Sequence, residues 1–184
     1  MLKISKIFFV SILLCLQFQP VKGQQHVFIV DTLKTLVDGR VAPYNSLKPG
    51  DTLELVSGIR KLIRIQNING EKDNPVIIIN QNGQVVINSD YNYGMSILNC
   101  HYFRLTGTGN PDNFYGIRIS RVTGGAGIGI GGMSSDYEID HLSIENCLSV
   151  GIFAKTDPDC SLLTTRGKFT QYNTVIHDNY VGHT

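Results

Sequence analysis

Tryptophan is absent from this 184-residue sequence, and only 17% of its residues are charged. An excess of either charge is also lacking, because 16 lysines and arginines stand against 15 aspartates and glutamates. A near-neutral chain does not have the positive surface that gripping a phosphate backbone requires, so we expect no nucleic-acid partner. The scarcity of charge also disfavours long amphipathic helices, which are built largely from alanine, leucine, glutamate and lysine.

Glycine is frequent, with 19 residues, and isoleucine, asparagine, threonine and serine recur along the chain. The chain is 42% hydrophobic, which is enough to build a core, and its length suits one domain. β-Branched residues favour strands, whereas glycine and asparagine favour turns. The composition therefore predicts a β-rich, turn-rich globular protein.

The N-terminal segment has the three parts of a secretory signal peptide. Lys3 and Lys6 precede an apolar stretch at residues 7–16, and small residues follow near residue 23. This stretch has about half of the roughly twenty residues that a transmembrane helix needs. We therefore predict a signal peptide at residues 1–23 and a protein that is secreted, periplasmic or at the cell surface, without stable membrane insertion after cleavage. The alternative is a buried N-terminal strand or a short anchor.

Short runs of β-branched residues recur after residue 75, with turn-forming residues between them. One set of runs begins near residues 76, 96, 116 and 138, and a second set begins near 85, 102 and 127. Two sets that advance together predict a solenoid with about 20 to 24 residues per cycle. A β-sandwich is the structural alternative, but its strands alternate more strongly between apolar and polar residues.

The frame Ile-x-Asn-Cys occurs at residues 97–100 and again at 144–147, which is two such cycles later. Strands in a sheet lie about 4.8 Å apart, so two cycles separate the cysteines by about 10 Å. A disulfide needs Cα atoms within about 7 Å. We therefore predict that Cys100 and Cys147 are free and buried. A third cysteine of the mature chain, Cys160, makes the number odd.

Several segments carry a family resemblance. The turn Pro-Gly-Asp-Thr at residues 49–52 leads into a strand-like run, Asn-Pro at 74–75 precedes a run of isoleucines, and residues 102–107 and 115–119 continue the pattern. These segments resemble the opening coils of secreted bacterial, Bacteroidetes-type right-handed parallel β-helix proteins of the pectate-lyase-like superfamily. The resemblance covers residues 47–183.

This resemblance implies an all-β right-handed parallel β-helix, a solenoid of about six coils. We expect an N-terminal cap region at residues 24–50 and the coils at residues 51–184. Enzymes of this group usually have more coils and a C-terminal cap. The sequence therefore predicts an uncapped C-terminal end, which either further coils of a longer chain or an oligomer would complete.

The resemblance also implies a protein that acts on or binds polysaccharide, similar to a polysaccharide lyase or a glycoside hydrolase, or an inactive fragment of one. The alternative is a non-catalytic, adhesin-like surface solenoid that binds a glycan or a protein partner. The shared residues are turn and core positions, so the resemblance concerns the fold and leaves open whether the chain is an enzyme.

Elimination from a uronic acid needs a base for the proton next to the carboxylate and a cation for the charge that develops. Lys155, at the exit of a strand-like run, is the candidate base. Arg166 is the candidate for charge neutralisation, and His177 is the candidate proton donor. Each of these is also a common surface residue, and nothing in their spacing selects a triad.

Two further groups of residues are candidates for binding. Tyr91, Tyr93 and Tyr115 belong to a locally aromatic stretch that would suit a sugar subsite, with core stacking as the alternative. Asp136, Glu138 and Asp140 alternate along one strand-like run and are expected to project from one face. Their spacing of about 6.6 Å is wide for one ion, so a calcium site there needs help from an adjacent coil. A solvated acidic face is the alternative.

Overall fold

The computed structural model describes residues 25–156 and 171–183, and these residues form strands with one short helix. The helix is a 3-10 turn, η1 (Tyr44–Ser46). The strands are β1 (Val27–Val30), β2 (Leu36–Asp38), β3 (Thr52–Arg60), β4 (Ile63–Gln66), β5 (Val76–Ser89), β6 (Tyr93–Leu98), β7 (His101–Thr106), β8 (Ile117–Val122), β9 (Ala126–Gly131), β10 (Ser135–Asp140), β11 (Leu142–Glu145), β12 (Ile152–Ala154), β13 (Thr174–His177) and β14 (Tyr180–Gly182).

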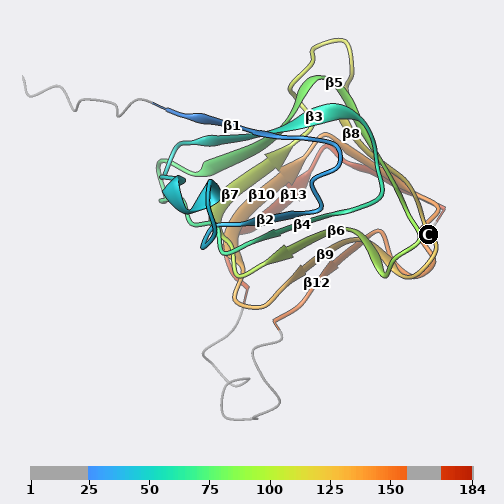
Figure 1. Cartoon of the computed structure of the whole chain (residues 1–184). Coiled ribbons are helices and arrows are strands. Elements are labelled where there is room, and N and C mark those ends of the chain that lie inside the picture. The colour runs from blue at the N-terminus through green and yellow to red at the C-terminus, as the bar shows by residue number, and fades with distance from the viewer. Residues whose placement is uncertain (1–24, 157–170, 184) are drawn as a thin grey trace, which may run out of the picture.

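These strands form two sheets, and within each sheet all the paired strands are parallel. Sheet A has the order β13-β10-β7-β5-β8-β11-β14, with β3 also paired to β5 and β1 paired to β3. Sheet B has the order β12-β9-β6-β4-β2. Figure 1 shows β4, β6, β9 and β12 stacked in one layer and β7, β10 and β13 in another. The predicted all-β class with parallel strands is confirmed.

The long strand β5 divides sheet A into two halves. Residues 76–79 of β5 pair with β7, whereas residues 85–89 pair with β8. The first half of sheet A therefore contains β7, β10 and β13, and the second half contains β8, β11 and β14. After each pass through both halves the chain enters sheet B, as when β7 and β8 are followed by β9.

The core consists of apolar residues that stack in register. Leu53, Ile78, Leu105 and Ile139 occupy neighbouring positions on β3, β5, β7 and β10, and all four are fully buried. A similar row on sheet B contains Ile65, Ile97 and Ile130. Branched side chains suit this pleated, buried surface, which accounts for the abundance of isoleucine.

Residues with left-handed backbone mark the corners between strands. Asn67 and Asn99 both have positive φ and follow β4 and β6, and Gly132 takes the same conformation after β9. Asparagine tolerates this conformation better than most residues because its side chain bonds nearby backbone groups. The Asn99 side chain does so by accepting a hydrogen bond from the Met133 backbone N–H at 2.9 Å. The recurrence of asparagine in the sequence thus reflects the corners.

The predicted cycle length is wrong. Most paired positions lie farther apart along the chain than that cycle allows, since Val76 pairs with Phe103 and Tyr137 pairs with Thr174. The pairs between β9 and β12, such as Ile128 with Ile152, are the ones that fit it. The predicted strand sets are also wrong, because the run near residue 96 belongs to sheet B, whereas that near residue 76 belongs to sheet A. The corners and loops between the strands differ in length, so the strands do not start at a constant spacing along the sequence.

Cys100 and Cys147 are free and buried, as predicted. Their expected equivalence is wrong, however, because Cys100 follows β6 of sheet B and Cys147 follows β11 of sheet A. Burial raises the pKa of the Cys100 thiol to about 12, which keeps it protonated and unreactive.

The expected cap region at residues 24–50 contains β1 and β2, which pair with β3 of sheet A and β4 of sheet B. The predicted signal peptide, Cys160 and Arg166 lie outside the described residues. Within the described residues, no helix has the length and apolar character needed to cross a membrane.

Candidate functional site

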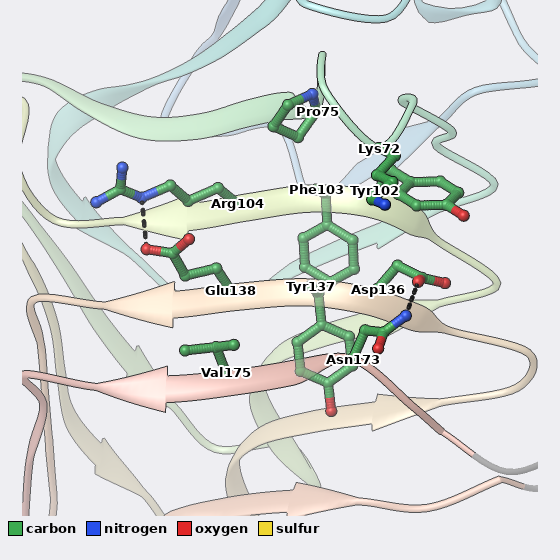
Figure 2. Close-up of a pocket in the computed structure, with 10 residues that line it drawn as sticks. All are labelled: Lys72, Pro75, Tyr102, Phe103, Arg104, Asp136, Tyr137, Glu138, Asn173 and Val175. Atoms are coloured by element: carbon green, nitrogen blue, oxygen red, sulfur yellow. Dashed lines mark hydrogen bonds and ion pairs between the residues drawn. The ribbon is translucent and has the colours of Figure 1, made fainter.

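The candidate site is an open pocket of about 540 Å³ at the start of strands β7, β10 and β13 (Figure 2). These strands are neighbours in the first half of sheet A, although β7 and β13 are far apart in the sequence. The residues that line the pocket are Lys72, Pro75, Tyr102, Phe103, Arg104, Asp136, Tyr137, Glu138, Asn173 and Val175.

Three residues at this pocket have a left-handed backbone conformation. Tyr102 and Asp136 are the second residues of β7 and β10, Asn173 directly precedes β13, and each has a φ of about 50°. A left-handed backbone is rare for a bulky residue such as tyrosine and costs free energy. Asn173 donates a hydrogen bond to Asp136 at 2.7 Å, which ties two of these residues together.

Two residues of the pocket lining, Phe103 and Tyr137, carry aromatic rings that are almost fully buried. Phe103 and Tyr137 are adjacent in register on β7 and β10, and their rings stack with centroids 5.2 Å apart. The two rings lie one below the other in Figure 2. The Tyr137 hydroxyl donates a hydrogen bond to Gln171 at 2.7 Å, so its polar end is satisfied.

Asp140 is the most deeply buried charged group near the pocket, with 0% of its side chain exposed. It accepts hydrogen bonds from Arg104 Nε at 2.8 Å and from the Thr106 hydroxyl at 2.5 Å, and the His141 Nδ1 atom lies 2.6 Å away. Burial alone would raise the pKa of Asp140, but these hydrogen bonds outweigh it and lower the pKa. Asp140 therefore stays ionised and fixes Arg104 in place.

Glu138 and His177 lie beside this pair and are partly exposed. Arg104 Nε is 3.3 Å from Glu138, and His177 Nε2 is 3.0 Å from the same carboxylate. The other ring nitrogen of His177 is 2.8 Å from Asp178. Hydrogen bonds to Asp178 and then to Glu138 raise the pKa of His177, so this imidazole holds a proton to higher pH than an ordinary histidine.

The structure regroups the residues predicted to bind metal. Potential ligand atoms of Glu138, Asp140 and His177 lie within 4.8 Å of one another. Asp136 instead accepts hydrogen bonds from Asn173 and Ser135. The Arg104 guanidinium already provides positive charge beside Glu138 and Asp140. A calcium site at Asp136, Glu138 and Asp140 stays a prediction.

The predicted catalytic residues are not brought together in the described part of the chain. His177 lies on β13 in the cluster described above. Lys155 directly follows β12 of sheet B, and its ammonium group lies 5.5 Å from the centroid of the Phe153 ring. Arg166 is outside the described residues.

The three predicted binding tyrosines lie at two separate places. Tyr91 is an exposed residue of the turn before β6, and Tyr93 begins that strand and accepts a hydrogen bond from Arg64 at 2.8 Å. Tyr115 precedes β8 and packs edge-on against Phe114, with ring centroids 4.9 Å apart. Neither place is in the pocket.

Arg104, Lys72, Asn173 and Tyr102 line the pocket but were not among the site residues predicted from the sequence. Arg104 alternates with the buried Phe103 and Leu105, which is the available sequence signal that it faces away from the core.

No protein family model, curated protein or solved structure matches this chain.

The raised pKa of His177 gives a testable pH dependence. We expect its imidazole to titrate above pH 6.5, and we expect Asp178→Asn to lower that pKa more than Glu138→Gln does, since Asp178 has the larger effect. The contacts therefore stabilise the fold below pH 6.5, and this stabilisation is lost as the pH rises through the raised pKa. Histidine resonances followed by NMR across pH 5 to 9 measure this. A His177 pKa at or below 6.5 would contradict the described contacts.

Proposed function

We propose that this chain is a secreted or cell-surface parallel β-helix protein that binds an acidic polysaccharide on the outer face of the first half of sheet A. The order of the strands supports the β-helix. The chain visits the two halves of sheet A and then sheet B in β5 and β6, again in β7, β8 and β9, and again in β10, β11 and β12. Parallel pairing between successive visits suits stacked coils.

The proposed acidic ligand rests on one observation, which is how the guanidinium of Arg104 is held by its neighbours. In the described part of the chain, both its hydrogen bond to Asp140 and its close contact with Glu138 use Nε. The two terminal nitrogens of the guanidinium are therefore left for a ligand, while the rest of the group is held in one orientation. A planar guanidinium of this kind suits a carboxylate or a sulfate, which it can bind through two hydrogen bonds.

The rest of the pocket suits a sugar. The partly exposed Tyr102 offers an aromatic ring, and Lys72, Asp136 and Asn173 offer donors and acceptors for hydroxyl groups. A mixture of apolar surface and a few polar groups is typical of small-molecule and saccharide sites. The pocket lies on an open strand face, so a polymer can extend beyond it.

Glu138 and His177 favour a second candidate function, a polysaccharide lyase. With a uronate carboxylate on Arg104, Glu138 would accept the C5 proton. The C4–O bond would break as a C4–C5 double bond forms, and protonated His177 would donate its proton to the departing oxygen. Asp140 is fully buried, so Glu138 is the accessible carboxylate in contact with Arg104.

The first test is binding by an Arg104→Gln variant. We expect it to bind polygalacturonate, alginate or chondroitin sulfate about 10-fold to 100-fold more weakly than the unchanged protein, since a charge-assisted hydrogen-bond pair is lost. Arg118→Gln is the matched control, because Arg118 is also an outer-face arginine of sheet A that pairs with a carboxylate, Glu145, at 2.8 Å. Affinity electrophoresis on each polymer and on a neutral glucan gives the dissociation constants. Equal effects of the two substitutions would refute the proposed site.

The second test separates a lyase from a binding protein. If the protein is a lyase, the absorbance of unsaturated uronate should appear with one of these polymers, and Glu138→Gln should slow it by about 100-fold or more. Glu145→Gln, at the matched ion pair, should have little effect, and so should Lys155→Ala on sheet B. Repeating the assay with calcium and with a chelator tests the predicted calcium site. Binding without turnover under all conditions would favour the non-catalytic, adhesin-like alternative.

A further inference from the structure

An exposed aromatic patch lies at the opposite end of the same strands from the pocket. We define it as Phe114, Tyr115, His141 and Tyr180. The Phe114 ring contacts both Tyr115 and His141, with centroids 4.9 and 4.8 Å away, and the Tyr115 ring lies 6.4 Å from that of Tyr180. Phe114 is 61% exposed, so this patch is not part of the core.

The aromatic patch is connected to the candidate site through His141. This histidine directly follows β10, and its Nδ1 atom lies 2.6 Å from the carboxylate of Asp140, which holds Arg104. The pocket is at the start of β7 and β10, whereas the patch adjoins their ends. From Tyr102 to Thr106 the strand advances by about 13 Å. Arg104 and Glu138 lie between the two ends, and His177 is in register with Asp140 at the end of β10.

The outer face thus presents a line of three features: the pocket beside Tyr102, the charged centre at Arg104 and Glu138, and the aromatic patch. A small ligand would need only the first two. Exposed aromatic rings suit the apolar faces of sugars, and they suit them best where a charged group fixes the adjoining part of the ligand.

We infer that a glycan chain lies along the strands, from the pocket across Arg104 to the aromatic patch, and that the patch holds a distal sugar of the same chain. This inference rests on the proposed polysaccharide function. It assigns to Phe114 and Tyr180 a role that the pocket does not include. It also sets the direction of the ligand, which runs along the strands and not across them from coil to coil.

The absence of tryptophan from the chain makes a direct test available. Phe114→Trp introduces a single tryptophan into the patch, and Tyr91→Trp introduces one at a similarly exposed aromatic position, 53% against 61%, before β6. The probes are dimers and octamers of galacturonate and of alginate. We expect octamers to shift or quench the emission of the Phe114→Trp protein, whereas dimers leave it unchanged. The emission of the Tyr91→Trp protein should change with neither.

A second variant measures the contribution of the ring to binding. Phe114→Ser should weaken octamer binding about fivefold and leave dimer binding unchanged, because one ring–sugar contact is lost. Unchanged octamer affinity, or unchanged emission of the Phe114→Trp protein while binding still depends on Arg104, would overturn the inference but leave the proposed function standing. Emission that depends on protein concentration without any glycan would also overturn it, since the patch would then bind a second copy. Failure of every oligomer to bind the unchanged protein counts against the proposed function itself.

Discussion

The ion pair between the buried Asp140 and Arg104 is the constraint on which the candidate site depends. A carboxylate with no exposed surface is costly unless hydrogen bonds compensate its charge, and Arg104, Thr106 and His141 provide that compensation. The contacts of Arg104 with Asp140 and Glu138 use its Nε atom, so its two terminal nitrogens point away from these carboxylates. The contacts of Asp140 also connect the pocket to the aromatic patch, because His141 contacts both Asp140 and Phe114.

Each member of this arrangement comes from a different pass of the chain. Arg104 is on β7, Asp140 on β10 and His177 on β13, and parallel pairing sets the three strands side by side. Near the start of these strands the backbone is left-handed at Tyr102, Asp136 and Asn173. The same stacking that buries Leu105 and Ile139 in the core therefore lines up charged groups on the outer face and polar groups at the pocket.

The sequence was sufficient for the all-β class and the parallel strands, which follow from its composition and its short runs of branched residues. The prediction that Cys100 and Cys147 are free and buried is also confirmed, but the reasoning behind it, that they occupy equivalent positions two cycles apart, was wrong. The sequence was not sufficient for the strand register. The segment between β7 and β8 and the one between β12 and β13 differ in length, so the step along the chain from Phe103 to its partner Tyr137 is shorter than the step from Tyr137 to its partner Thr174. His177 was identified as a candidate, but its partner Glu138 was assigned to a metal site and Arg104 was missed. Only the register brings the three together.

The most direct test of this account is amide hydrogen exchange of the unchanged protein with and without a bound acidic polymer. Bound polymer should slow exchange at the starts of β7, β10 and β13 and at residues 113–116, and should leave β8, β11 and sheet B unchanged. Slowed exchange on sheet B or on the second half of sheet A, with none at β7 and β10, would contradict the assignment of the binding face.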